Sequence, residues 1–164
     1  MPERIEKPIS KEEFDSIIEP YKDQMIVQNV GLSYGSMIYF LMDKVLHKRD
    51  DMLELTLWGW YWRLFKDKEE ICSSETITRK FAETVLSDIM KQSRFEGAHI
   101  LGSKCTLSFS NGVRVFLEQR PEVDDSDDLF FLSLVDNRDS ILILTNDIPP
   151  QFKIGYNSRT SARN

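Results

Sequence analysis

Two short runs of alternating apolar and polar residues, separated by Asn111-Gly112, restrict the fold of this chain more than any other feature. Residues 106–110 and 113–117 place an apolar side chain at every second position, which is the spacing of a strand with one buried face. Asn-Gly is typical of the type I′ turn, whose twist matches that of two paired strands. The sequence therefore predicts a β-hairpin here, and with it an antiparallel sheet.

Further segments of the chain have the composition of strands. Residues 53–57 alternate leucines with polar side chains, so this strand is expected to have one solvent-facing side. Other strands are expected over residues 25–30, 37–41, 60–65, 70–73, 129–135 and 141–144. Because most connections between these segments are short, neighbouring strands are expected to be antiparallel.

Two segments show helical patterns. Ser10 followed by Glu13 is a capping-box signature, and it predicts a short helix that Pro20 ends. A longer helix is expected over residues 74–92, capped by Ser74 or Thr76. Its apolar stripe consists of Ile77, Phe81, Val85 and Ile89, with Ala82 and Leu86 beside them, and it is wide enough to pack on a sheet.

These elements predict an α+β fold: a mostly antiparallel bent sheet or small β-sandwich, with a short N-terminal helix and one longer packed helix. The 164 residues suit a single α+β domain, which we expect over residues 1–150, beginning with a loose arm over residues 1–9. Pro149-Pro150 is expected to end the regular structure, so that residues 151–164 form a polar, disordered tail.

The chain has the features of a cytoplasmic protein. No apolar segment is long enough to cross a membrane, and residues 1–10 lack the apolar region of a signal peptide. Without an export signal, Cys72 and Cys105 are expected to be reduced thiols at half-buried strand positions.

Acidic side chains gather in one part of the chain. The net charge is −6, and residues 118–147 carry nine acidic residues and two arginines. Such a field attracts basic partners and repels nucleic acid and anionic membranes. The acidic loop over residues 122–128 lacks the glycine turn and distal glutamate of a calcium-binding EF-hand.

Motifs for catalysis and cofactor binding are absent from the sequence. It contains no Gly-x-Ser-x-Gly elbow and no glycine-rich phosphate loop. His47 and His99, taken together with Cys72 and Cys105, lack the short spacing of zinc ligands. We therefore expect no catalytic residue, no metal ion and no cofactor, and predict that the protein is not an enzyme.

Residues 58–62 contain three tryptophans and a tyrosine. Gly59 is expected to interrupt the strand alternation as a bulge or tight bend, so Trp60 and Trp62 are expected to face the core, with Trp58 and Arg63 on the opposite face. A stacking platform for single-stranded nucleic acid would need a basic groove, whereas this chain is acidic. Trp58 or Tyr61 is therefore a candidate for an exposed aromatic contact with a partner protein.

In its general character the chain resembles the small acidic immunity proteins of bacterial polymorphic-toxin and contact-inhibition systems. The resemblance rests on the strand pattern over residues 53–65, the helical pattern over 74–92, the hairpin over 107–116 and the acidic segment over 118–128. It implies one cytoplasmic domain without catalytic motifs. It also implies a protein that neutralises a toxin, in many cases a basic nuclease, by covering its active site or a nearby surface.

We therefore predict a non-catalytic protein-binding inhibitor, an immunity protein whose partner is a basic toxin. The acidic loop would meet Lys and Arg side chains of the toxin, and an exposed aromatic side chain would supply a buried anchor. The expected partner-binding residues are Glu122, Asp124, Asp125, Asp127, Asp128, Trp58 and Tyr61.

Two other classes of function stay open at this point. A small-molecule-binding domain or an enzyme would need an aromatic-lined cavity in the sheet, and the candidates to line it are Trp60, Trp62, Tyr39 and Phe40. A structural or regulatory subunit would be stable only in an oligomer, and the sequence leaves monomer and homodimer undecided. Neither nucleic acid nor a membrane is an expected partner.

Overall fold

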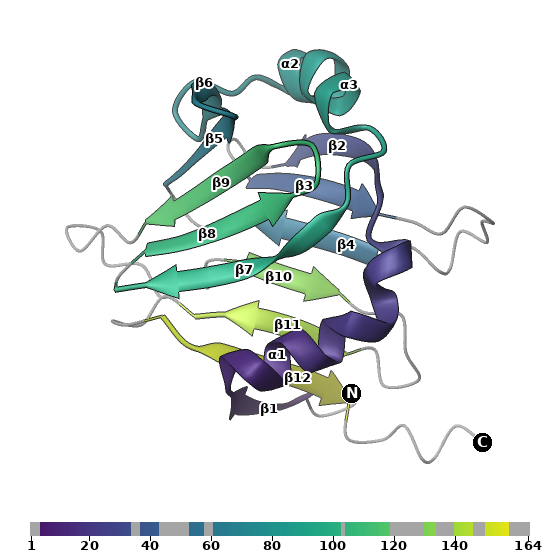
Figure 1. The fold of residues 1–164 in the computed structure, drawn as a ribbon, viewed down its shortest axis with the longest axis vertical. Helices are drawn as coiled ribbons and strands as arrows, with labels where there is room; N and C mark the ends of the chain where they lie inside the picture. The colour runs from purple at the N-terminus through teal and green to yellow at the C-terminus, as the bar shows by residue number, and fades with distance from the viewer. Residues whose placement is uncertain are drawn as a thin grey trace.

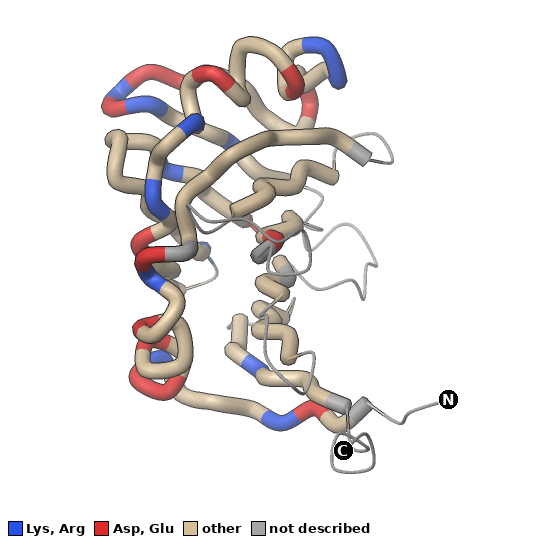
Figure 2. Tube along the Cα trace, turned by 90° about the vertical axis from the view of Figure 1, so that its right-hand side faces the viewer, with Lys and Arg blue, Asp and Glu red and all other residues tan. Residues whose placement is uncertain are grey.

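The chain forms two antiparallel β-sheets that enclose a common core. The computed structural model describes residues 4–33, 37–42, 53–57, 61–102, 104–118, 130–133, 140–145 and 150–157. Strands account for 58% of the structure and helices for 23%. Figure 1 shows the smaller sheet in front of the larger one, and Figure 2 shows these layers from the side.

Seven strands of the described residues form the larger sheet, and each is antiparallel to its neighbours. In order across the sheet they are β1 (Arg4–Ile9), β12 (Phe152–Asn157), β11 (Ile141–Leu144), β10 (Phe130–Ser133), β4 (Leu53–Leu57), β3 (Met37–Met42) and β2 (Val27–Ser33). The other five described strands form the smaller antiparallel sheet. Their order is β6 (Glu69–Ser73), β5 (Trp62–Lys66), β9 (Val113–Glu118), β8 (Lys104–Phe109) and β7 (Phe95–Leu101).

Alternation along the strands produces the core between the sheets. In β9, Val113, Val115 and Leu117 are buried, whereas the residues between them are exposed. The ring centres of Phe40 in β3 and Phe109 in β8 lie 5.4 Å apart, so the inner faces of the two sheets are in contact.

The predicted hairpin is present as β8 and β9, with Leu107 opposite Val115. Its turn is not type I′, because Gly112 has a φ of +85° whereas Asn111 is not among the residues with positive φ. The side chain of Asn111 explains the difference. It accepts from the Val113 N–H (3.2 Å) and donates to the carbonyl oxygen of Ile89 (2.9 Å), which ties the turn to the helical segment beside it.

Gly112→Ala is expected to lower the free energy of unfolding by about 1–3 kcal/mol, because an L-residue is strained at this φ. A Cβ at position 112 would also lie 2.5 Å from Asp67 Oδ1. Gly102→Ala is the matched control, since Gly102 has a φ of +63° and open space around it. Urea denaturation of both variants should show the larger loss for Gly112→Ala. Equal losses would mean that Asp67 moves aside at no cost.

Helix α1 (Lys11–Ile18) begins at the predicted capping box. The Glu13 N–H donates to Ser10 Oγ (3.0 Å), and the Ser10 N–H donates to a carboxylate oxygen of Glu13 (3.3 Å). A short 3₁₀ helix (Glu19–Gln24) follows α1 directly. Pro20 lies in the first turn of this helix, where the missing N–H of a proline is tolerated. Figure 1 shows α1 below β7 and in front of β12, so the helix extends the front layer.

The prediction of one longer helix over residues 74–92 is wrong. The chain instead forms α2 (Arg79–Phe81), a π-helical turn (Ala82–Leu86) and α3 (Ser87–Met90). Ser74 and Thr76 do not cap the segment. The Thr78 hydroxyl does so, accepting a hydrogen bond from the Phe81 N–H (3.2 Å).

The buried side of this helical segment confirms the predicted stripe in part. Ala82 and Leu86 are fully buried together with Met90, whereas Val85 is 46% exposed. The reason is a contact with the edge of β2: Ser87 Oγ accepts from the Val30 N–H (3.0 Å) and lies 3.1 Å from the Val30 carbonyl oxygen. The segment therefore packs against a sheet edge rather than across a sheet face.

Both ends of the described chain enter the larger sheet. The expected loose arm over residues 1–9 and the expected end of regular structure at Pro149-Pro150 are therefore wrong. Strands β1 and β12 pair with each other, with Ile9 opposite Phe152, and β12 also pairs with β11. Residues 158–164 of the expected tail lie outside the described residues.

The predicted α+β class is also wrong, because the fold is dominated by its two sheets. The longest α-helix in the described residues, α1, has eight residues. None of the helices described here is long and apolar enough to cross a membrane.

Candidate functional site

The outer face of the smaller sheet carries an exposed group of aromatic and charged side chains. In β5, Trp62 and Leu64 are buried in the core, so Arg63 and Phe65 point outward. The strand register places Arg63 opposite Phe116 of β9. We call Arg63, Phe65, Phe116 and the neighbouring Tyr61 the aromatic face.

The side chains of the aromatic face are held in a defined arrangement. The rings of Phe65 and Phe116 meet edge to face, with centres 5.3 Å apart and planes at 82°. The guanidinium of Arg63 lies 5.1 Å from the centre of the Phe65 ring. Arg63 Nε also donates to Glu70 Oε1 (2.6 Å), and this hydrogen bond together with the charge of Glu70 raises the pKa of Arg63. The guanidinium therefore lies between a carboxylate and an aromatic ring.

A hollow of about 200 Å³ lies at one end of this face. Besides the four residues of the aromatic face, it is lined by Lys104, Leu117 and Glu118. The Glu118 N–H donates to the Tyr61 carbonyl oxygen (3.2 Å), and Lys104 Nζ lies 3.9 Å from a Glu118 carboxylate oxygen. Phe116, with 36% of its surface exposed, supplies apolar contact area beside the hollow. The arrangement can take up an apolar or long aliphatic side chain of another molecule next to charged groups of both signs.

Of the predicted partner-binding residues, the structure describes Tyr61 and places it in this hollow. The other predicted residues lie outside the described residues; they are Trp58, Glu122, Asp124, Asp125, Asp127 and Asp128. Glu122 follows Glu118 by four residues and Trp58 precedes Tyr61 by three.

The sequence prediction missed Phe65 and Phe116. Each occupies an outward position in a strand whose alternation is visible in the sequence, so this alternation could have identified both as exposed aromatic residues. Their contact depends on the pairing of β5 with β9, which are about fifty residues apart in the chain. Arg63 lies on the outward face, where alternation placed it.

The described side chains among those proposed for an aromatic-lined cavity do not line one. Trp62 and Phe40 are fully buried in the core. Tyr39 lies on the opposite face of β3 from Phe40, against Gly31 of the neighbouring strand. Trp60 lies outside the described residues.

The remaining candidates for chemistry do not form a catalytic or metal-binding cluster among the described residues. Cys72 and Cys105 are free and buried, in β6 and β8. His99 is an exposed residue of β7, and His47 lies outside the described residues. Among the residues that the structure describes, no three His, Cys, Asp or Glu side chains are placed to hold a metal ion.

Comparison with known proteins identifies no relative. No protein-family model, no curated protein and no solved structure matches the chain.

Proposed function

We propose that this protein is a non-catalytic inhibitor that binds another protein through the aromatic face and the acidic segment next to it. The observation that supports this is the ordered, solvent-facing group of Tyr61, Arg63, Phe65 and Phe116 around a hollow. Exposed aromatic and arginine side chains of this kind are the usual energetic centres of protein interfaces.

The partner proposed is a basic protein, and the resemblance to immunity proteins makes a cytoplasmic toxin the first candidate. Arg63 is neutralised by Glu70, and Lys104 lies next to Glu118. The acidic residues predicted for binding follow Glu118 directly along the chain. A Lys or Arg side chain of the partner would place its aliphatic part on Phe116 and its charge beside these carboxylates. Nucleic acid and membranes are not proposed as partners.

The test compares three immobilised proteins in a lysate of the organism that encodes the chain, at low and at high salt. They are the wild type, the Tyr61→Ala/Phe116→Ala variant, and the control Val85→Ala, which shortens an exposed apolar side chain elsewhere. We expect one basic protein to be retained by the wild type and the control and lost with the double variant. For the purified partner, the double variant should weaken binding at least about tenfold.

Two further measurements complete this test. One equivalent of the wild-type protein should block the activity of the purified partner, and a variant with Asp124, Asp125, Asp127 and Asp128 changed to Asn should bind it more slowly at low salt. An unchanged Kd in the double variant would show that the aromatic face is not the contact. A partner that stays fully active when bound would contradict the inhibitor function. A lysate from which the wild type retains no basic protein would count against both the proposed binding through the aromatic face and the inhibitor function.

A further inference from the structure

The larger sheet extends beyond the smaller one at one end of the molecule. β7 is the last strand of the five-stranded sheet, whereas β12 and β1 are the last two strands of the seven-stranded sheet at this end. In Figure 1, β12 and β1 lie below β7, with α1 in front of β12. The layer that covers β12 is therefore made partly by β7 and partly by α1, and these two elements meet over it.

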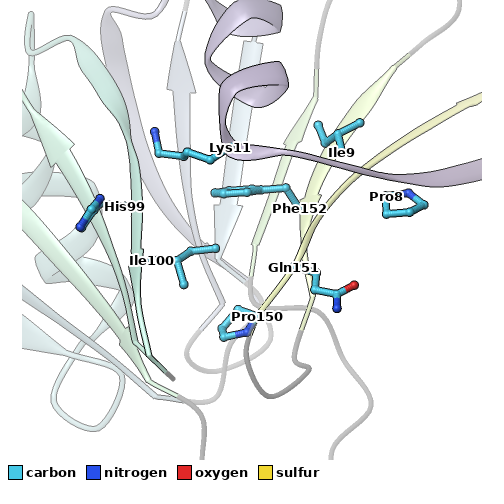
Figure 3. Close-up of a pocket in the computed structure, with 8 residues that line it drawn as sticks. All are labelled: Pro8, Ile9, Lys11, His99, Ile100, Pro150, Gln151 and Phe152. Carbon is cyan, nitrogen blue, oxygen red and sulfur yellow. The ribbon is translucent and has the colours of Figure 1, made fainter.

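A mostly apolar cavity of about 410 Å³ lies at this junction, within the size range of ligand pockets. Figure 3 shows Ile100 of β7 and Phe152 of β12 pointing toward each other across it, whereas the imidazole of His99 lies on the far side of β7. Ile9 of β1 and Pro150 add to the apolar lining.

Two of the lining side chains occupy inner positions that the protein covers only in part. Ile100 lies two residues after Ala98, which is buried in the core, so strand alternation directs both side chains inward. Ile9 lies opposite Phe152 in the register of β1 and β12. Nevertheless, Ile9 and Ile100 are only half-buried. An apolar ligand in the cavity would complete their burial, and the water that it displaces has few hydrogen-bond partners in such a lining.

One ammonium group belongs to the lining of this cavity, that of Lys11 at the start of α1. Its Nζ lies 2.7 Å from each carboxylate oxygen of Asp15. An ammonium has three protons, so at least one of them has no acceptor among the described residues. Burial raises the pKa of Cys105 in β8, and the charge of Lys11 acts against this rise. The positive field of Lys11 therefore reaches the smaller sheet on the other side of the cavity.

These features restrict the chemistry of a ligand. Lys11 needs an acceptor, and among the described lining residues it is the one Lys or Arg. A group with a single negative charge matches a single ammonium, whereas a phosphate dianion is usually held by several cationic donors. A peptide would bring backbone N–H and C=O groups that an apolar lining leaves unpaired, at a cost in free energy.

We propose that the cavity binds an aliphatic carboxylate, with its chain between Ile100 and Phe152 and its carboxylate beside Lys11. Because the volume is near the lower end of the range for ligand pockets, we expect a chain of about six to ten carbons. The site shares no residue with the aromatic face, so it does not depend on the proposed inhibitor function.

The probes are saturated straight-chain carboxylates of about four to fourteen carbons, which are ionised at pH 7. They are titrated into the full-length protein, and binding is followed by NMR of the isoleucine methyl groups. At least one should bind with a Kd below about 1 mM and shift the signals of Ile9 and Ile100, with that of Ile89 in α3 unchanged. The Kd should fall about three- to fourfold for each added CH₂ until the cavity is full, and then stay level.

Two substitutions in the same strand test where the chain lies. Ile100→Trp fills the cavity and should weaken the tightest carboxylate at least about tenfold. Leu101→Trp is the matched control, because it adds the same ring at the next position, where the side chain is 75% exposed. It should change the Kd less than about twofold. Circular dichroism checks the fold of both variants.

Lys11→Gln tests the position of the carboxylate and leaves the apolar lining intact. It should weaken the carboxylate about three- to fivefold and leave the affinity for the alcohol of the same chain length unchanged. Lys22→Gln is the control, because Lys22 forms a comparable exposed ion pair with Glu19 (3.0 Å), and it should affect neither ligand.

Three outcomes would overturn the proposal. If no carboxylate of the series binds, the cavity is not a site for this class of ligand. Binding that Ile100→Trp leaves unchanged would place the ligand elsewhere on the protein. An alcohol that binds as tightly as its carboxylate, together with an unchanged Kd in Lys11→Gln, would assign the cavity to uncharged apolar molecules. Each of these results leaves the aromatic face untouched, since the lysate experiment tests that surface separately.

Discussion

In the folded protein, Cys72 and Cys105 should react with a thiolate-specific disulfide reagent about a thousand times more slowly than in the unfolded chain. Burial raises the pKa of each thiol from 9.0 to about 12. For Cys72 the charge of Glu70 adds to this effect, whereas for Cys105 a backbone hydrogen bond from His99 and the charge of Lys11 act against it. At a pH three units below the pKa, about 99.9% of a thiol is protonated and therefore unreactive.

The measurement is the rate of reagent release near pH 8, with and without urea. Cys72→Ala and Cys105→Ala each leave one thiol, so the two rates are obtained separately. Folded and unfolded rates within about tenfold of each other would show that local opening exposes the thiol, since the pKa difference sets a larger ratio.

The same pKa shifts determine how the free energy of unfolding changes with pH. A thiol whose pKa is raised by folding keeps its proton in the folded state after the unfolded state has lost it. The contribution of the two thiols to the free energy of unfolding is therefore fully present below about pH 9, which is their pKa in the unfolded chain. It is lost as the pH rises toward 12. A Cys72→Ala/Cys105→Ala variant should accordingly show a smaller fall in unfolding free energy between about pH 8 and pH 10 than the wild type.

Local patterns predicted the elements whose partners are near in sequence. The capping box of Ser10 and Glu13 and the hairpin around Asn111-Gly112 are complete within a few residues, so their geometry is encoded there. The turn type was missed because the side chain of Asn111 bonds to Ile89, more than twenty residues away. An Asn-Gly pair favours one turn in isolation, and this tertiary contact selects another.

Long-range pairing explains the larger errors. Strands β1 and β12 join opposite ends of the chain. β12 does alternate Phe152, Ile154 and Tyr156 with polar or small residues, but it follows Pro149-Pro150, which favours an end of regular structure, and its pairing with β1 cannot be read from either segment alone. The exposure of Val85 in the helical segment after Thr78 was not predicted, for a similar reason. The segment packs on the edge of β2 through Ser87, and a periodic apolar pattern contains no information about such an edge contact.

The candidate site was predictable in composition but not in assembly. The concentration of aromatic residues drew attention to Tyr61, which does line the hollow. The ring of Phe116 comes from another strand and meets Phe65 only through the register of β5 and β9. A contact between two outward side chains on different strands cannot be derived from either strand alone.

Phe14→Ala should lower the free energy of unfolding by about 3–5 kcal/mol. Phe14 has no exposed surface, and its ring lies 4.4 Å from that of Phe152 and 6.2 Å from that of Phe130, measured between centres. Phe14 thus packs α1 against aromatic side chains of the larger sheet, beside Ile18, the other buried residue of this helix. Urea denaturation, followed by fluorescence and analysed at constant m value, measures the loss.

Phe116→Ala is the control, since it removes the same ring from the solvent-facing side of the smaller sheet. Its expected cost is about 0.5–1.5 kcal/mol, the value of one aromatic pair. Similar losses for both variants would show that α1 is not docked through Phe14. If the docking is as described, Phe14→Ala should also speed amide exchange in β12 more than in β9, because Phe152 loses its cover while the β8–β9 hairpin keeps all of its contacts with the core.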